Sequence, residues 1–154
     1  DQEGVDESEY FKVMLDDMEE KYPIEWNTDE ALTACVINGD KELLRRAIGN
    51  LITNSQTHNP DGCTISVCVR KSDTEYKIVV EDNGVGVTDE KLEKIRTTPH
   101  YMMSDGGTTE PRHGLGLLIV GQIVSAHKGT VSFDHGKQGG FAVTISFPIP
   151  KDSQ

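Results

Sequence analysis

Hydrophobic residues recur along this chain at two spacings, which predict alternating helices and strands. Apolar residues three and four apart predict amphipathic helices at 10–22, 40–58, 88–95 and 115–126. Alternation of apolar and polar residues predicts strands at 24–26, 34–37, 64–70, 76–81, 130–133 and 141–147. Elements in this order predict an α/β (α+β) two-layer sandwich, with one mixed sheet and helices on one face.

The segment 96–113 breaks this pattern. It loses its periodicity and gathers Thr, Gly, Pro and Ser. A structureless segment of this length inside a compact domain is usually functional. We therefore expect residues 96–113 to form a lid over a binding site.

Length and charge narrow the functional classes. The 154 residues suit a single domain, 1–154, and the net charge of −11 argues against nucleic acid as a partner. Any phosphate ligand must therefore be held locally, by a metal, a helix N-terminus or a few cations. No apolar run reaches the length of a membrane span, and the acidic N-terminus lacks the basic start of a signal peptide. We expect a cytoplasmic domain of a longer protein, with no direct membrane contact; any membrane anchor would belong to the parent protein.

Two asparagines, Asn50 and Asn54, lie four residues apart on the helix predicted at 40–58, so they share one face. Asparagine is a mediocre helix former, and its amide is costly to bury without a hydrogen-bond partner. A bound polar ligand would supply that partner, since Mg²⁺ accepts an amide oxygen beside phosphate and water oxygens. The alternative is that both amides cap nearby backbone or face solvent.

Asp82 ends a predicted strand and is followed by glycines at 84 and 86. A carboxylate accepts hydrogen bonds from an exocyclic amine, so Asp82 can hold the N6 amino group of adenine and reject the carbonyl oxygen of guanine. Gly84 and Gly86 permit positive φ and let the backbone approach a flat ring closely. The alternative is a plain Asn-Gly hairpin turn. The spacing does not fit a calcium-binding EF-hand loop.

The run His113-Gly114-Leu115-Gly116-Leu117 joins the predicted lid to a helix. Free N–H groups and the dipole at a helix start form an anion site suited to phosphates. Arg112 would neutralise a phosphate as the lid closes, or else it is a solvated loop cation. The run is not a P-loop, because no Gly-Lys-Ser/Thr follows it.

The Asn pair, the Asp-Asn-Gly-Val-Gly run at 82–86 and the His-Gly-Leu-Gly-Leu run resemble the N, G1 and G2 boxes of the GHKL family. That family comprises histidine kinases, the gyrase B subunit, the heat-shock chaperone of ninety kilodaltons and mismatch-repair ATPases. The chain is most similar to the histidine-kinase branch. The resemblance covers about residues 38–148, beyond an N-terminal helix and strands at 1–37. It implies the Bergerat fold, with a mostly antiparallel sheet and a long ATP lid.

The resemblance also implies roles for single residues. Asn54 would bind Mg²⁺, and Asn50 would stand where the family's ATPases and serine kinases have a glutamate base. His58 would pack beside the nucleotide. Ile95 and Tyr101 would replace the phenylalanines of the F box, which is absent here.

Thr57 departs from the family pattern. Histidine kinases usually have Lys or Arg at this phosphate-facing position, so a cation that would pair with phosphate is missing here. Asn50 bears on the reaction itself, because an amide cannot take a proton at neutral pH. A histidine acceptor needs no strong base, since neutral imidazole already presents a lone pair.

These observations predict the ATP-binding catalytic domain of a bacterial-type sensor histidine kinase. It would use Mg²⁺ with ATP and transfer the γ-phosphoryl to a histidine in two-component signalling. No histidine here has an acceptor-like sequence context, so its partners would be ATP and ADP, the parent protein's dimerisation and phosphoacceptor helices, and a downstream response regulator. Two alternatives remain open. One is a GHKL ATPase or serine-kinase module, opposed by Asn50; the other is a nucleotide-binding regulatory module without catalysis, supported by Thr57.

Overall fold

The computed structural model of the protein describes residues 11–28, 41–97 and 111–148, and within 111–118 it describes the helical backbone. The helices are α1 (Phe11–Lys21), α2 (Lys41–His58), α3 (Asp89–Thr97) and α4 (Pro111–Ala126). The strands are β1 (Glu25–Thr28), β2 (Ile65–Lys71), β3 (Glu75–Asp82), β4 (Thr130–His135) and β5 (Phe141–Pro148).

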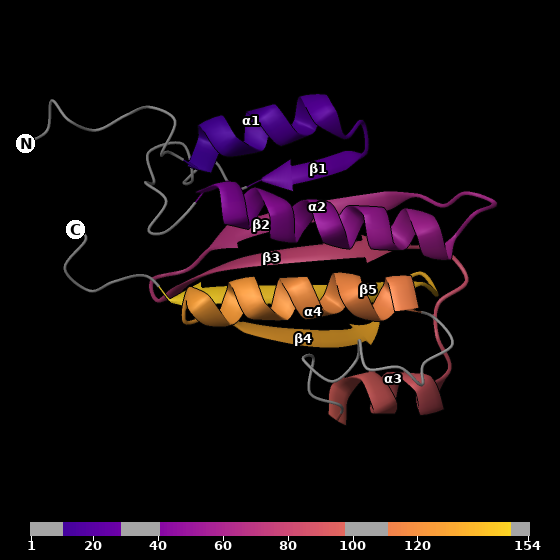
Figure 1. The fold of residues 1–154 in the computed structure, drawn as a ribbon. Helices are drawn as coiled ribbons and strands as arrows, with labels where there is room; N and C mark the ends of the chain where they lie inside the picture. Colours follow the sequence, from indigo (N-terminus) through magenta and orange to yellow (C-terminus); the bar gives the residue numbers. More distant parts are fainter. Residues whose placement is uncertain (1–10, 29–40, 98–110, 149–154) are drawn as a thin grey trace, which may run out of the picture.

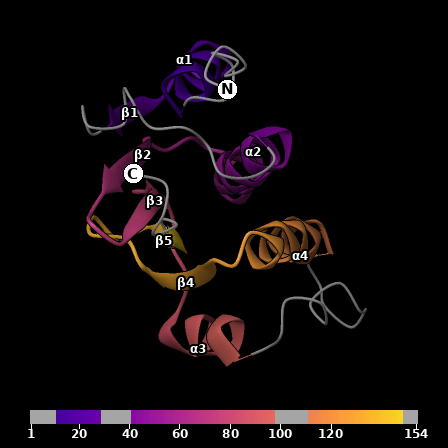
Figure 2. The same ribbon diagram turned by 90° about the vertical axis from the view of Figure 1, so that its left-hand side faces the viewer.

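The strands form one mixed sheet in the order β1-β2-β3-β5-β4. Strand β1 runs parallel to β2, and the other three pairs of neighbours are antiparallel. Helices α1, α2 and α4 cover one face of the sheet, and α3 lies beside β4 (Figures 1 and 2). The predicted two-layer α/β sandwich is confirmed, with α3 at the sheet's edge rather than on its covered face.

The core fills the space between this helical layer and the sheet. Strands β2 and β3 alternate buried and more exposed residues, because successive side chains point to opposite faces. On α2 the buried residues recur three and four apart, which turns a single apolar stripe toward the strands. Representative side chains that are almost fully buried are Ile48, Ile52, Val67, Ile78 and Ile145.

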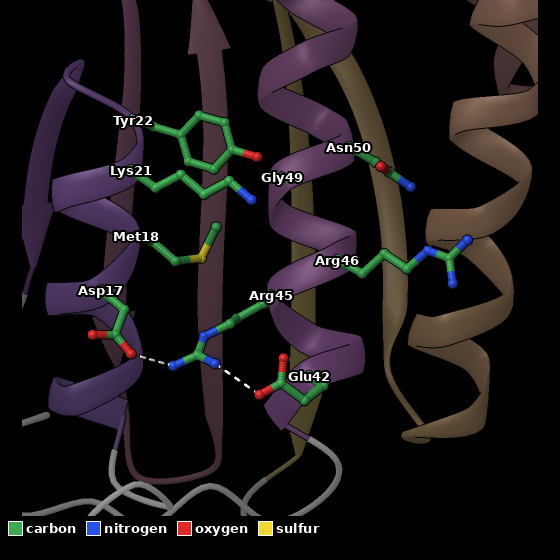
Figure 3. Close-up of a pocket in the computed structure, with 9 residues that line it drawn as sticks. All are labelled: Asp17, Met18, Lys21, Tyr22, Glu42, Arg45, Arg46, Gly49 and Asn50. Atoms are coloured by element: carbon green, nitrogen blue, oxygen red, sulfur yellow. Dashed lines mark hydrogen bonds and ion pairs between the residues drawn. The ribbon is translucent and has the colours of Figure 1, made fainter.

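Helix α1 is attached to α2 by polar and close-packed contacts. The Arg45 guanidinium on α2 pairs with Asp17 on α1 and with Glu42 one turn earlier, the latter at 2.8 Å. Gly49 lets the helices approach, because a Cβ at this position would lie 2.9 Å from the Tyr22 hydroxyl oxygen. These contacts hold α1 along the outer side of α2, and Arg45 points away from α4 (Figure 3).

The boundaries of the predicted lid need correction. Arg96 and Thr97 belong to the last turn of α3, and α4 begins at Pro111 rather than at Leu115. Proline suits the first helical position, where its fixed φ fits and its missing N–H would have no partner. Residues 98–110 lie outside the described chain, as do the strand predicted at 34–37 and the cap predicted at position 40. The cap of α3 is Thr88, whose hydroxyl oxygen accepts from the Lys91 N–H at 3.1 Å.

Candidate functional site

The end of β3, the last turns of α2 and the start of β5 meet at one end of the sheet, close to the first turn of α4 (Figure 1). Asp82 lies at this junction, and only 4% of its surface is exposed. Its Oδ1 accepts from the N–H of Gly84 at 2.9 Å and from the N–H of Phe141 at 3.3 Å. Its Oδ2 accepts from the Ser55 hydroxyl at 2.8 Å. Three segments of the chain thus orient one carboxylate.

Asn59, immediately after α2, holds the loop that follows Asp82. This side chain is 5% exposed, and its Nδ2 donates to the Ser55 carbonyl oxygen at 2.8 Å. Its Oδ1 accepts from the Val85 N–H, also at 2.8 Å. A Cβ on Gly84 would collide with the Asn59 amide, so glycine is required here for space. The loop is therefore fixed against the end of α2.

The glycines of this region differ in what they provide. Gly86 has a φ of 68°, so the expectation of positive φ holds at this position and not at Gly84. A Cβ on Gly86 would also collide with the Gly139 carbonyl oxygen. A Cβ on Gly140 would overlap with the backbone and carboxylate oxygens of Asp82. The loops after β3 and before β5 therefore touch through backbone atoms.

Asn50 and Asn54 lie on successive turns of α2, and both side chains are half-buried. The Nδ2 atom of Asn50 is buried and has no hydrogen-bond partner among the described residues. Figure 3 shows this side chain pointing away from α1 and toward α4. A buried amide N–H without a hydrogen-bond acceptor destabilises the fold by roughly 1–3 kcal/mol. A ligand that supplied an acceptor would remove this cost.

The other predicted site residues are more scattered. Thr57 is exposed in the last turn of α2, and His58 beside it is half-buried. Ile95 is 4% exposed and packs into the core beneath α3. The run Arg112 to Leu117 (Arg112, His113, Gly114, Leu115, Gly116 and Leu117) lies in the first two turns of α4 and not in the loop before it.

Sequence reasoning missed two residues of this site, Ser55 and Asn59. Ser55 lies four residues after Leu51, within the apolar stripe of α2, and it is 6% exposed. A hydroxyl at such a position needs a buried partner, so helical spacing alone contained a signal for it. Asn59 follows Ser55 by four residues but lies in a turn motif, which concealed its role.

Cys63 reports on the charge at this site. Burial raises the pKa of its thiol, and the negative charge of Asp82 raises it further, whereas a hydrogen bond with Asn59 lowers it. The net direction of the pKa of Cys63 is upward from its ordinary value.

The described residues contain no cluster of three His, Cys, Asp or Glu side chains suited to a metal ion. No helix in the described ranges is both long and apolar enough to cross a membrane.

The sequence profile of a family described as "Histidine kinase-, DNA gyrase B-, and HSP90-like ATPase" matches residues 39–151. The chain belongs to this family. Sporulation kinase B of Bacillus subtilis (strain 168) is 36% identical to it over 114 residues, which are 73% of this chain and 25% of that kinase. The chain spans a quarter or less of the length of such curated relatives.

Solved structures agree with the family assignment. The ATP-binding domain of PrrB from Mycobacterium tuberculosis is 25% identical, covers 96% of both chains and superposes with a TM-score of 0.63. The histidine kinase domain of the E. coli osmosensor EnvZ shares the fold, with a TM-score of 0.68 at 22% identity, over 94% of this chain and 89% of that one. Within its family, the chain corresponds to the ATP-binding domain of sensor histidine kinases. The family and fold expected from the three boxes are confirmed.

Proposed function

We propose that this domain binds Mg-ATP at the junction of α2, β3 and β5, and that within its parent protein it transfers the γ-phosphoryl to a histidine. The observation that carries the proposal is the buried, oriented Asp82 carboxylate. A carboxylate has about four acceptor positions, and protein donors take three of them here. Because Oδ1 already accepts two N–H groups, the remaining position is on Oδ2. It suits one exocyclic amino group, such as N6 of adenine.

The same loops would lie beside a flat base. Gly84 packs without a Cβ against the Asn59 amide and Gly86 against the Gly139 carbonyl oxygen, which fixes the backbone of the loop next to Asp82. His58 at the end of α2 is a half-buried ring that would pack beside the base. We assign Ile95 to packing that supports the pocket through α3, not to direct contact with the nucleotide.

The residues on α2 fit a metal-bound polyphosphate. Asn54 offers an amide oxygen and lies one turn from Asn50, whose buried Nδ2 has no acceptor in the described ranges of the chain. Asn54 would be the protein ligand of Mg²⁺, and Asn50 would donate to a phosphate oxygen. When bound, Mg²⁺ would neutralise charge on the phosphate oxygens. With no described cluster of acidic residues nearby, most of its ligands would be phosphate and water oxygens.

The first turns of α4 would complete the phosphate site. A helix N-terminus presents unpaired N–H groups and a positive dipole end. Only N–H groups of the first turn, such as those of Arg112 and His113, lack a partner within the helix, and Arg112 would add a cation. Thr57 would offer the phosphates a hydroxyl group and no positive charge.

Asn50 determines the choice of acceptor in this proposal. An amide cannot deprotonate water or a serine hydroxyl, so the bound nucleotide is protected from hydrolysis. A neutral imidazole brings its own lone pair, and positioning by the domain is then sufficient. The phosphoacceptor helices of the parent protein would supply that histidine, and a response regulator would receive the phosphoryl group.

The test is to join this domain to the phosphoacceptor helices of its parent kinase and to add labelled ATP. We expect label that is lost in acid and retained in base, as a phosphoramidate requires, while the isolated domain binds ATP with little hydrolysis. Label that survives acid would favour the serine-kinase alternative. Binding without any transfer would favour a regulatory module that has lost catalysis, the alternative that Thr57 supports.

A further inference from the structure

The two arginines of α2 have different surroundings. Arg45 faces α1 and is occupied by Asp17 and Glu42. Arg46 is exposed, and among the described residues it has no hydrogen bond or ion pair. Figure 3 draws the residues that line a groove of about 510 Å³ beside α1 and α2, Arg46 and Asn50 among them, and shows the Arg46 side chain extending toward α4. Within the described part of the chain, the fold therefore leaves this cation of α2 without a partner, on the face where Asn50 lies.

Arg46 and Asn50 are a pair of donors on one face. They are four residues apart, so their side chains lie one above the other on α2. Both point toward α4 in Figure 3, and the buried Asn50 Nδ2 atom has no acceptor among the residues that the structure describes. A guanidinium and an amide N–H directed to the same side suit a cluster of anionic oxygens, because guanidinium matches phosphate geometry.

The position of Arg46 along α2 indicates which phosphate group of the nucleotide it would contact. Ser55 marks the base end of the site, since its hydroxyl orients Asp82. Asn54, Asn50 and Arg46 then follow toward the helix N-terminus, and Arg46 lies nine residues from Ser55. At the rise of an α-helix this separation is about 13 Å along the axis. Arg46 is thus the member of this row farthest from the base.

We infer that Arg46 binds the terminal phosphoryl group of the nucleotide beside Asn50, and so lets the domain distinguish ATP from ADP. The inference rests on the proposed function, because it takes the Asp82 end as the base site. Arg46 would also supply the cation that is missing at Thr57. The two residues lie at opposite ends of the stretch of α2 that carries Asn50 and Asn54.

The test compares the affinities of the domain for Mg-ATP, Mg-ADP and AMP by calorimetric titration, in the wild type and in Arg46→Gln. Loss of one guanidinium–phosphate contact should weaken ATP binding about tenfold. ADP should change by less than about twofold and AMP not at all, since neither carries the terminal group. The matched control is Arg45→Gln, which removes the neighbouring arginine on the other side of α2 and should leave all three affinities unchanged.

The outcomes separate this inference from the function on which it rests. If the wild type binds ATP and Arg46→Gln keeps the same ratio of ADP to ATP affinity, the Arg46 assignment is wrong and the nucleotide site stands. Equal weakening of ATP, ADP and AMP would also overturn it, since that pattern reports damage to the site as a whole. A wild-type domain that binds none of the three would overturn the proposed function, and the role of Arg46 with it.

Discussion

Replacing Asp82 by Asn separates the structural role of this side chain from its role in recognition. Alanine would be a poor choice, because it leaves the buried Phe141 N–H and the Ser55 hydroxyl without an acceptor. Each such loss costs roughly 1–3 kcal/mol and would confuse binding with stability. Asparagine has nearly the same shape and keeps one oxygen.

Neighbouring hydrogen-bond donors determine the orientation of the amide group in the Asp82→Asn variant. Two backbone N–H groups, from Gly84 and Phe141, face the Oδ1 position, so the amide oxygen must occupy it. The NH₂ group then takes the Oδ2 position, where the Ser55 hydroxyl can rotate from donor to acceptor. Three charge-assisted hydrogen bonds become neutral ones, each weaker by about 1 kcal/mol. The lower cost of burying an amide offsets part of this loss. We expect the free energy of unfolding to fall by about 1–2 kcal/mol, measured by urea denaturation.

The effect on nucleotide recognition should be larger. With NH₂ at the Oδ2 position, the variant presents a donor where the wild type presents an acceptor for the adenine amino group. Loss of a hydrogen bond to a charged acceptor, about 1.5–3 kcal/mol, corresponds to a loss of about ten- to a hundredfold in ATP affinity. The preference for ATP over GTP should shrink, since guanine presents a carbonyl oxygen at that position. Calorimetric titration with both nucleotides measures this, and a variant that keeps the wild-type ATP affinity and preference would refute the assignment.

The thiol of Cys63 provides a control within the same variant. The charge of Asp82 is one of two causes that raise its pKa, and burial is the larger. Removing the charge should lower that pKa toward its ordinary value. A larger thiolate fraction at a fixed, mildly alkaline pH then speeds alkylation. Faster labelling of Cys63 in the variant, read by mass spectrometry, would confirm that Asp82 contributes to the raised pKa of this thiol, and an unchanged rate would contradict it.

Two further predictions address the metal and the packing of the site. Asn54→Ala should abolish the gain in ATP affinity that Mg²⁺ brings and leave the circular dichroism spectrum unchanged; a full Mg²⁺ response in the variant would mean that the protein ligand lies elsewhere. Gly140→Ala should destabilise the fold by about 3 kcal/mol, because its Cβ overlaps Asp82. Gly139→Ala should cost only about 1 kcal/mol, because it meets open space and bears only the strain of its φ of 96°. Equal losses for the two glycines would contradict the close packing around Asp82.

Local spacing was sufficient to predict most elements of this fold. The apolar stripe of α2 and the alternation in β2 can be seen in the sequence, because buried positions recur at the spacing of a helix or of a strand. The helix predicted at 88–95 likewise turns one side inward, where Leu92 and Ile95 are buried. Apolar spacing predicts a start of α4 at Leu115, four residues after its true start at Pro111, because no periodic pattern is present over 96–113. Proline at the first helical position was the better signal.

The contacts that shape the site depend on residues distant in the sequence. Asn59 reaches Val85, and Phe141 reaches Asp82, across separations of 26 and 59 residues. No spacing rule connects such pairs, because their proximity follows from strand order and from the packing of α2 on the sheet. The three boxes point to Asp82 and the loop that follows it, whereas the fold shows Ser55 and Asn59 as the side chains that hold them in place.

The charge of the domain explains why its site would rely on neutral donors. With a net charge of −11, the protein repels a polyanion at long range, although salt screens this repulsion beyond about 8 Å. Affinity must then come from groups in direct contact. Amides, helix N–H groups and one or two arginines can provide it without a large positive field. A metal that travels with the phosphates reduces the repulsion further, because the ligand arrives partly neutralised. Asn50, Asn54 and Arg46, an arginine with no ion pair among the described residues, are therefore a donor set on one face of α2 that an acidic domain can use for a nucleotide.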